Sequence, residues 1–293
     1  MNKFSEKLLD WYKINKRQLP WRNSNNPYYV WISEIILQQT KVSTGLKYFN
    51  TFIYKYPTIF DLSCSTEEEV LLIWQGLGYY SRAINILKTA KVITKKYHGI
   101  FPNVYNDLIK LPGIGDYTAS AILSICFNKP YPVIDGNVYR VLSRYFDINQ
   151  PINKYASKKI FYDLAKSILD FNNPGDYNEA LMEFGALNCK PLKPLCNACV
   201  LKKKCLSFKK NIVSLRPVKI KKKQKKVRFF NYLVPFDLDN NTVLIKREDN
   251  DIWKGLYEFP LIETSKILNC DDLIYIDSLP IWAKQDGIFI GKI

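Results

Sequence analysis

Four cysteines in one short stretch constrain the fold of this chain more than any other feature of its sequence. They follow the spacing Cys189-x6-Cys196-x2-Cys199-x5-Cys205, which places four soft ligands within seventeen residues. Such a compact set indicates a loop that wraps one metal centre. From the spacing alone, a structural zinc ion and a four-iron cluster fit equally well, because each takes four thiolates.

The rest of the sequence indicates a soluble protein in a thiol-reducing compartment. The first residues mix charged and apolar side chains and lack the apolar core and cleavage site of a secretory signal. No segment approaches eighteen uninterrupted apolar residues, so we expect no membrane span. In a reducing compartment cysteines ligate metals more often than they form disulfides. We therefore expect a cytoplasmic protein that holds a metal.

Basic charge is concentrated in one part of the chain. The net charge is +16, and residues 189–228 carry fifteen Lys or Arg and no Asp or Glu, whereas residues 229–293 carry six basic and eleven acidic side chains. A polyanionic partner explains this concentration better than solubility alone, although a solvated basic surface is the simpler alternative. Nucleic acid is therefore the partner we expect.

Three regions differ in their sequence patterns. Apolar residues recur at intervals of three and four through most of residues 1–208, which predicts an all-helical region. Residues 209–228, with KIKKKQKK at their centre, have too little apolar content to fold alone and are interpreted as a basic linker. Beyond them, short β-branched or aromatic runs at 229–234 and 242–245 predict a hairpin of a small second domain.

The segment Leu111–Ala119 reads Leu-Pro-Gly-Ile-Gly-Asp-Tyr-Thr-Ala and opens an apolar helix. Two glycines, Gly113 and Gly115, would let backbone amides approach a phosphate at the helix N-terminus. A Gly-x-Gly pair alone is usually just a turn. With Leu-Pro before it and Thr-Ala after it, the segment resembles the helix-hairpin-helix of the endonuclease III and MutY glycosylase superfamily.

This resemblance implies a mainly α, two-lobed helix-hairpin-helix glycosylase fold. One lobe would hold six helices at about residues 25–130, and the N-terminal segment would join residues 131–208 in a lobe with an iron–sulfur cluster loop. The cysteine spacing also resembles that of the superfamily, which implies one [4Fe-4S] cluster instead of zinc. In the family the cluster is structural and faces DNA.

An aspartate follows the hairpin segment by about twenty residues. Asp135 ends an apolar Pro-Val-Ile approach and precedes Gly136, a position that is most often a turn or a helix N-cap. By resemblance it is the catalytic aspartate of the superfamily, and Asn137 helps to position it. A fixed carboxylate would stabilise the positive charge that builds on the sugar as a glycosidic bond breaks.

A second carboxylate lies near the N-terminus. Glu34 stands in the string Trp-Ile-Ser-Glu-Ile-Ile-Leu-Gln-Gln-Thr, an apolar helical stretch that would raise the pKa of a carboxyl group. Taken alone it is a helix glutamate that points to water. The full string, however, resembles the adenine glycosylase motif. That resemblance makes Glu34 the general acid, which protonates adenine N7 and then helps to activate water.

Two other functions compete with adenine removal. An endonuclease III-type enzyme, which removes oxidised pyrimidines and cleaves the strand, uses a lysine nucleophile where this chain has Tyr117. Schiff-base chemistry needs an amine, so Tyr117 favours a monofunctional glycosylase. A non-catalytic DNA-binding module would need only the hairpin and the cluster, and it would leave Glu34 and Asp135 without a role.

Further residues resemble family positions that bind DNA and the flipped base. Trp21 and Arg22 in Leu-Pro-Trp-Arg, together with Glu183, resemble residues that line the extruded adenine. Gln39 and Tyr79 resemble residues inserted beside the estranged partner base, and we count the neighbouring Thr40 as a DNA contact. The expected substrate is double-stranded DNA with adenine opposite 8-oxoguanine or guanine, bound by a monomer of a bacterial, nucleoid-associated type.

The C-terminal region resembles the start of the MutT-like (Nudix-like) domain that reads 8-oxoguanine in the family. Residues 253–260 match its Trp-x-Gly-Leu-Tyr-x-Phe-Pro segment, and residues 229–293 form a shortened α+β domain in this interpretation. The Phe-Ser-His loop and the Nudix glutamates are absent, so we expect no nucleotide hydrolysis and weakened discrimination for 8-oxoguanine. We expect the last thirty or so residues to be the least well ordered.

Overall fold

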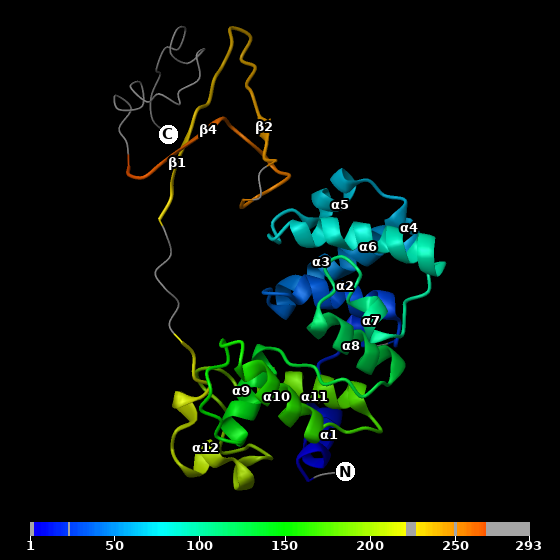
Figure 1. Ribbon diagram of the computed structural model, residues 1–293, viewed down its shortest axis with the longest axis vertical. Coiled ribbons are helices and arrows are strands. Elements are labelled where there is room, and N and C mark those ends of the chain that lie inside the picture. Colours follow the sequence, from blue (N-terminus) through cyan, green and yellow to red (C-terminus); the bar gives the residue numbers. More distant parts are fainter. Residues whose placement is uncertain (1–2, 23, 221–226, 249–250, 268–293) are drawn as a thin grey trace. The chain divides into compact units, whose positions relative to one another are not determined.

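A computed structural model of the chain describes residues 3–22, 24–220, 227–248 and 251–267. It divides into two compact units, Met1–Lys221 and Lys222–Ile293 (Figure 1). Within the described ranges, no helix has the length and apolar character needed to cross a membrane.

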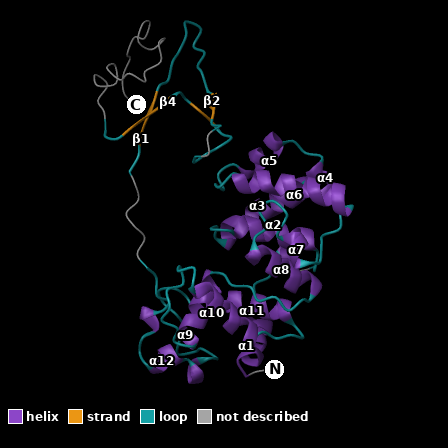
Figure 2. Ribbon diagram, in the orientation of Figure 1, coloured by secondary structure: helices purple, strands orange, loops and turns teal. Residues whose placement is uncertain are grey.

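The regular elements that the structure describes in the first unit are all helices, joined by loops (Figure 2). Its α-helices are α1 (Lys3–Asn15), α2 (Pro27–Leu37), α3 (Val42–Lys55), α4 (Ile59–Ser63), α5 (Glu67–Trp74), α6 (Ser81–Tyr97), α7 (Tyr105–Leu108), α8 (Asp116–Phe127), α9 (Gly136–Tyr145), α10 (Ser157–Ser167), α11 (Pro174–Leu187) and α12 (Leu206–Lys209). Three short 3-10 helices, Pro20–Arg22, Lys202–Lys204 and Val213–Leu215, complete it.

Two separate hydrophobic cores divide this unit into two lobes. One core runs from Leu19 to Leu123 and is built mainly by α2 to α8. The other combines α1 with α9, α10 and α11. In Figure 1, α1 lies beside α11 and away from the helices that follow it in sequence. The two-lobed, mainly helical fold expected from the sequence is confirmed.

Helices α2, α8 and α11 bring the candidate site together across the lobes. Helix α8 packs against α2 in one lobe and against α11 in the other. The contact of α8 with α11 is close at Gly175, where an added Cβ would lie 2.7 Å from the Ser124 carbonyl oxygen. Glycine is therefore required at this crossing, because any side chain would separate the two helices.

The linker expected at residues 209–228 is too long at its N-terminal end. The backbone N–H of Ile152 donates to the Val218 carbonyl at 3.0 Å, and Asn153 forms two hydrogen bonds with the backbone of Ile220. These contacts attach residues 209–220 to the helical unit, and the division falls between Lys221 and Lys222. A basic segment can dock in this way because its contacts use backbone atoms and because Lys210 and Arg216 form ion pairs with Asp147.

The described part of the second unit contains two small antiparallel sheets. Strand β1 (Phe229–Tyr232) pairs with β4 (Leu261–Thr264), and β2 (Ile245–Lys246) pairs with β3 (Tyr257–Glu258). The strand expected at 229–234 is present as β1, and the run at 242–245 enters β2 only at Ile245. The hairpin expected from these two runs is wrong, because β1 pairs with β4 and β2 pairs with β3. The expectation of poor order in the last thirty residues falls mostly on 268–293, which lie outside the described residues.

Ion pairs connect the two sheets of this unit. Arg228, just before β1, contacts both Asp251 and Glu263 of β4. Arg247, just after β2, contacts Asp251 and Glu258 of β3. Asp251 is shared by the two arginines and so joins the β1–β4 sheet to the β2–β3 sheet. Among the residues of this unit that the structure describes, the buried apolar side chains Leu233 and Ile262 form a much smaller core than either helical lobe has.

Candidate active site

Glu34 is held inside the protein by a single strong side-chain hydrogen bond. It lies on α2, is 9% exposed, and accepts a 2.6 Å hydrogen bond at Oε2 from the Tyr117 hydroxyl. Burial raises the pKa of Glu34 to about 7, with a smaller upward effect from Asp135 and an opposing effect from the Tyr117 bond. Its carboxyl group can therefore give up or take a proton near neutral pH.

Tyr117 occupies the first turn of α8, directly after the Gly-x-Gly segment. Its hydroxyl also lies 3.5 Å from the Met182 sulfur. Burial and the nearby carboxylates of Glu34 and Asp135 hold the pKa of Tyr117 well above its ordinary value. The phenol therefore stays protonated and serves as a hydrogen-bond donor to Glu34.

Asp135 is the N-cap of α9, as one of the two sequence interpretations proposed. Its Oδ1 accepts a 2.7 Å bond from the Val138 backbone N–H, and its Oδ2 accepts a 2.6 Å bond from the Asn137 amide. Burial raises the pKa of Asp135, while these hydrogen bonds oppose the rise. The cap geometry fixes the Asp135 carboxylate, which lies near enough to Glu34 for its charge to raise the pKa of Glu34.

Two residues that sequence reasoning missed hold this aspartate in place. Arg140, on α9, donates 2.7 Å bonds to the Asn137 side chain and to the backbone carbonyls of Gly185 and Cys189. Asn178 on α11 accepts from the Val133 backbone N–H and so fixes the segment that leads into α9. Their polar side chains at helical spacing gave no distinctive sequence signal.

Glu183, expected from the sequence in the adenine pocket, accepts hydrogen bonds from two arginines in this structure. Although burial opposes it, hydrogen bonds from Arg17 and Arg22 lower the pKa of Glu183 to about 2. Arg17 reaches it at 2.6 and 2.8 Å, and Arg22 reaches it at 3.1 Å. Both of its carboxylate oxygens are thus engaged, and it ties α11 to the segment after α1.

One turn earlier on α11, Glu179 is the carboxylate that faces Glu34. It accepts bonds from the Tyr12 hydroxyl at 3.0 Å and from Arg22 at 3.1 Å. Burial raises the pKa of Glu179, and its charge in turn raises the pKa of Glu34. Sequence reasoning missed Glu179, since it shares one helix face with Glu183 and nothing local separates the two.

Trp21 and Arg22 lie beside this group but differ in exposure and role. Trp21 is 6% exposed and packs edge-on against Phe49, with ring centroids 5.0 Å apart, inside the first core. Arg22 bridges Glu179 and Glu183 and stacks over the Tyr12 ring. Of the two, Arg22 has polar contacts with two carboxylates, whereas Trp21 packs within the apolar core.

Gln39 and Tyr79 form a hydrogen-bonded pair on the surface. The Tyr79 hydroxyl donates to Gln39 Oε1 at 2.8 Å, and the Tyr79 side chain is 60% exposed. Both residues have left-handed backbone, with φ of 59° and 50°. The Thr40 hydroxyl makes a long bond of 3.4 Å to the Gln38 carbonyl. The structure thus brings together the two residues expected beside the partner base.

The two hairpin glycines precede α8 as expected. Gly113 has φ of 76°, and an added Cβ there would lie 2.9 Å from the Asn85 Cβ, so only glycine fits without a shift. Gly115 is the N-cap of α8, and an added Cβ would meet nothing within 4 Å. Open space in front of Gly115 is what close approach of a phosphate to the helix N-terminus requires.

Comparisons with known proteins agree with this geometry. Residues 32–166 match a family described as HhH-GPD superfamily base excision DNA repair protein. An adenine DNA glycosylase of Buchnera aphidicola from Schizaphis graminum is 42% identical over 99% of this chain and 80% of the relative. One from Arabidopsis thaliana is 38% identical over 95% of this chain and 50% of the relative.

The chain belongs to the adenine DNA glycosylase family.

Solved structures show the same architecture for this family member. A thermostable thymine-DNA glycosylase matches with a TM-score of 0.65 and 30% identity, over 71% of this chain and 95% of that one. A trapped covalent endonuclease III–DNA intermediate matches with a TM-score of 0.61 and 24% identity over the same shares, which supports the fold alone.

The four cysteines of this glycosylase-family chain lie together in one loop after α11. All four are free thiols of intermediate exposure. Burial, with help from neighbouring thiols, raises the pKa of Cys196 and Cys205 and raises that of Cys199 to about 11. Within the described ranges, no three metal-ligating side chains are close enough to hold a single ion.

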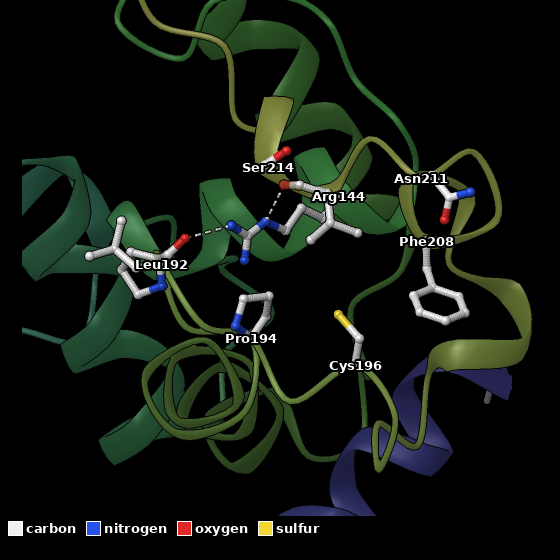
Figure 3. A pocket seen from close by; sticks show the side chains of 9 residues that line it. Arg144, Leu192, Pro194, Cys196, Phe208, Asn211 and Ser214 are labelled. Atoms are coloured by element: carbon white, nitrogen blue, oxygen red, sulfur yellow. Dashed lines mark hydrogen bonds between the residues drawn. The ribbon is translucent and has the colours of Figure 1, made fainter.

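Arg144 braces this loop. Its guanidinium donates to the carbonyls of Lys190 at 2.7 Å and Pro191 at 2.9 Å, and its Nη1 lies 3.5 Å from the Cys189 sulfur. Figure 3 shows Arg144 and Cys196 among the residues that line a cavity of about 420 Å³. Four reduced thiols on a loop fixed by a buried arginine are a donor set that suits a metal–sulfur centre.

Proposed function

We propose that this chain is a monofunctional DNA glycosylase that acts as a monomer and removes adenine mispaired with 8-oxoguanine or guanine. The observation that carries the proposal is Glu34, a buried carboxyl whose pKa is raised to about 7, mainly by burial and further by the nearby Asp135 carboxylate. Adenine is a poor leaving group unless it is protonated, so the reaction needs an acid that is still protonated near neutrality. The adenine DNA glycosylase relatives support the substrate.

The reaction would include two proton transfers, one from Glu34 to the base and one from water back to Glu34. Glu34 gives its proton to adenine N7, and the electrons of the bond from C1′ to N9 leave with the base. The sugar cation that remains faces the Asp135 carboxylate, which stabilises it electrostatically. Water then adds at C1′, and its proton returns to Glu34. The products are free adenine and an abasic site.

Tyr117 supports hydrolysis without strand cleavage. A lyase step needs an amine that forms a Schiff base with C1′, and a phenol cannot supply one. Tyr117 is also committed to Glu34 by its 2.6 Å hydrogen bond. It therefore tunes the acid, and Asn137, through its bond to Asp135, orients the other carboxylate.

The base pocket we propose differs in one residue from the sequence expectation. Arg22 stays in the pocket, and Glu179 takes the place of Glu183. Glu179 acts electrostatically on Glu34, whereas Glu183 is engaged by two arginines. Trp21 forms the apolar wall. A flipped adenine offers donors and acceptors on its edges that an arginine and a carboxylate can satisfy together.

Recognition of the mispair would come from the surface pair Gln39 and Tyr79, with Thr40 beside them. An exposed aromatic ring next to an amide can enter the stack and contact the partner base. Gly113 and Gly115 would hold a backbone phosphate at the start of α8.

We propose one [4Fe-4S] cluster on Cys189, Cys196, Cys199 and Cys205. Such a cluster supplies structural cross-linking of the loop and no step of base removal. Visible absorption of protein purified without oxygen tests this directly, because iron–sulfur clusters are coloured and zinc is not. A colourless protein that contains one zinc ion per chain would show that zinc, the alternative that the cysteine spacing allows, occupies the site.

The decisive experiment measures adenine release from duplexes that contain A opposite 8-oxoguanine, A opposite G, or A opposite T. Wild type and Glu34→Gln are compared under single-turnover conditions. Release from the first two duplexes by wild type alone supports the proposal. Tight binding without release by wild type would favour a non-catalytic module, and release of an oxidised pyrimidine with strand cleavage would favour an endonuclease III-type enzyme.

A further inference from the structure

Arg82 forms a bridge between the two loops that carry Gln39 and Tyr79. It lies in the first turn of α6, and its Nη1 donates to the carbonyls of Ile35 at 2.7 Å and Gln38 at 2.8 Å. Its Nη2 donates to the Gly78 carbonyl at 3.1 Å. One side chain thus closes the C-terminal end of α2 and holds the turn before α6.

The bonded carbonyls immediately precede the surface pair. Gln38 comes directly before Gln39, and Gly78 comes directly before Tyr79. Both Gln39 and Tyr79 have left-handed backbone, a conformation that residues with a Cβ rarely adopt without support. Arg82 therefore fixes the peptide groups that directly precede the two residues with left-handed backbone.

Stacking adds to the hydrogen bonds. The guanidinium carbon of Arg82 lies 5.5 Å from the centroid of the Tyr79 ring and 5.3 Å from that of the Trp74 ring. Trp74 is fully buried, and its indole N–H donates to the same Gly78 carbonyl at 3.1 Å. The exposed tyrosine is consequently tied through Arg82 to a rigid part of the core.

We propose that Arg82 is a positioning residue that sets the Gln39–Tyr79 pair in its DNA-inserting geometry before DNA binds. This inference rests on the proposed function, which assigns the pair to the mispair. Support of this kind reduces the ordering cost of binding. A planar guanidinium suits the role because it directs separate N–H groups to two loops, whereas the single ammonium group of lysine cannot span both.

The test is a double-mutant cycle with Arg82→Lys, which keeps the charge, and the variant pair Gln39→Ala with Tyr79→Ala. Base extrusion is followed by the fluorescence of 2-aminopurine placed as the target base, so this measurement needs no base release. Single-turnover adenine release is measured in parallel over a range of pH. Lys95→Arg, in the last turn of α6, is the matched control for a charge-conserving exchange on the same helix.

We expect Arg82→Lys to reduce both extrusion and adenine release about tenfold in the wild-type background. In the background without Gln39 and Tyr79 the same substitution should change either by less than about twofold, since the residues through which it acts are gone. The pH profile should stay where it is. Where the lysine variant does not fold, Arg82→Gln undergoes the same cycle.

Three results would overturn the inference. They are a full-sized effect of Arg82→Lys in the background without the pair, an unchanged extrusion signal, and a displaced pH profile, which would mean that Arg82 acts through Glu34 on α2. A wild-type chain that extrudes the base but releases no adenine would instead overturn the proposed function. The 2-aminopurine fluorescence of the double-mutant cycle would then still test the role of Arg82.

Discussion

The Tyr117 hydroxyl donates a 2.6 Å hydrogen bond to the Glu34 carboxylate, and this bond opposes the burial that surrounds Glu34. Burial favours the neutral carboxyl, whereas the donated bond favours the anion. Burial dominates, and the pKa of Glu34 rises to about 7. A group at this balance can act first as an acid and then as the acceptor of a proton from water.

Glu34→Gln should abolish this exchange while it preserves shape and hydrogen bonding. We expect single-turnover adenine release to fall by about 10²–10⁴-fold, the usual contribution of a positioned acid and base. DNA binding should be nearly unchanged. A variant that retains adenine release within about tenfold would remove Glu34 from the chemistry.

The same substitution should alter how stability depends on pH. The pKa of Glu34 is raised from 4.5 to about 7 on folding, so protonation favours the folded state. Its stabilising effect is complete below pH 4.5 and is lost as pH rises through 7. Denaturant unfolding of wild type and Glu34→Gln is measured at about pH 5.5 and about pH 8.5, one on each side of this pKa. The stability of the variant relative to wild type should be greater at the higher pH.

Tyr117→Phe should move the pH profile of activity upward. Removal of the hydroxyl removes a bond that lowers the pKa of Glu34, so Glu34 stays protonated to higher pH. The alkaline limb of kcat/KM for adenine release should shift to higher pH. A limb that moves to lower pH, or does not move, would show that the hydroxyl does not tune the acid.

Glu179 and Glu183 offer a matched pair, one turn apart on α11. Glu179→Gln should shift the alkaline limb to lower pH, because the charge of Glu179 raises the pKa of Glu34. Glu183→Gln should instead cost about 2–3 kcal/mol of unfolding free energy, since it breaks the bonds of a buried carboxylate to two arginines. Chemical denaturation and pH profiles of both variants separate the two roles.

The pKa of Glu183 gives an independent control on that assignment. It is lowered from 4.5 to about 2, so its contribution to stability is complete above pH 4.5 and is lost as pH falls toward 2. Wild type should lose stability over this acid range more steeply than Glu183→Gln does. Equal acid sensitivity of the two proteins would contradict the ion pairs with Arg17 and Arg22.

The contrast between Glu179 and Glu183 shows which parts of the site local sequence patterns can predict and which they cannot. The hairpin, the string around Glu34 and the spacing of the cysteines are local patterns, and the two-lobed fold they predicted is confirmed. Glu183 meets Arg17 across 166 positions of the chain. No local pattern tells which of two glutamates on one helix face turns to such a partner.

The N-terminal part of the basic segment, residues 209–220, is held to the helical unit by residues that are likewise distant in the sequence. Its composition predicted a linker that could not fold alone, yet the backbone of Val218 and Ile220 hydrogen-bonds to Ile152 and Asn153. Composition reports on side chains, whereas these contacts use peptide groups that every residue has. Arg82 was missed likewise, because its partners are carbonyls brought together only by folding.

Asp135→Asn separates the structural role of the cap from its charge. Asparagine is as good an N-cap as aspartate, so α9 should begin at the same residue and unfolding free energy should change by less than about 1 kcal/mol. The carboxylate that faces the sugar cation is lost, however, and adenine release should fall by about 10²–10³-fold. Serine, which also caps, should behave like asparagine in stability. If Asp135→Asn instead unfolds while keeping its activity per folded molecule, the carboxylate serves the helix and another group must stabilise the cation.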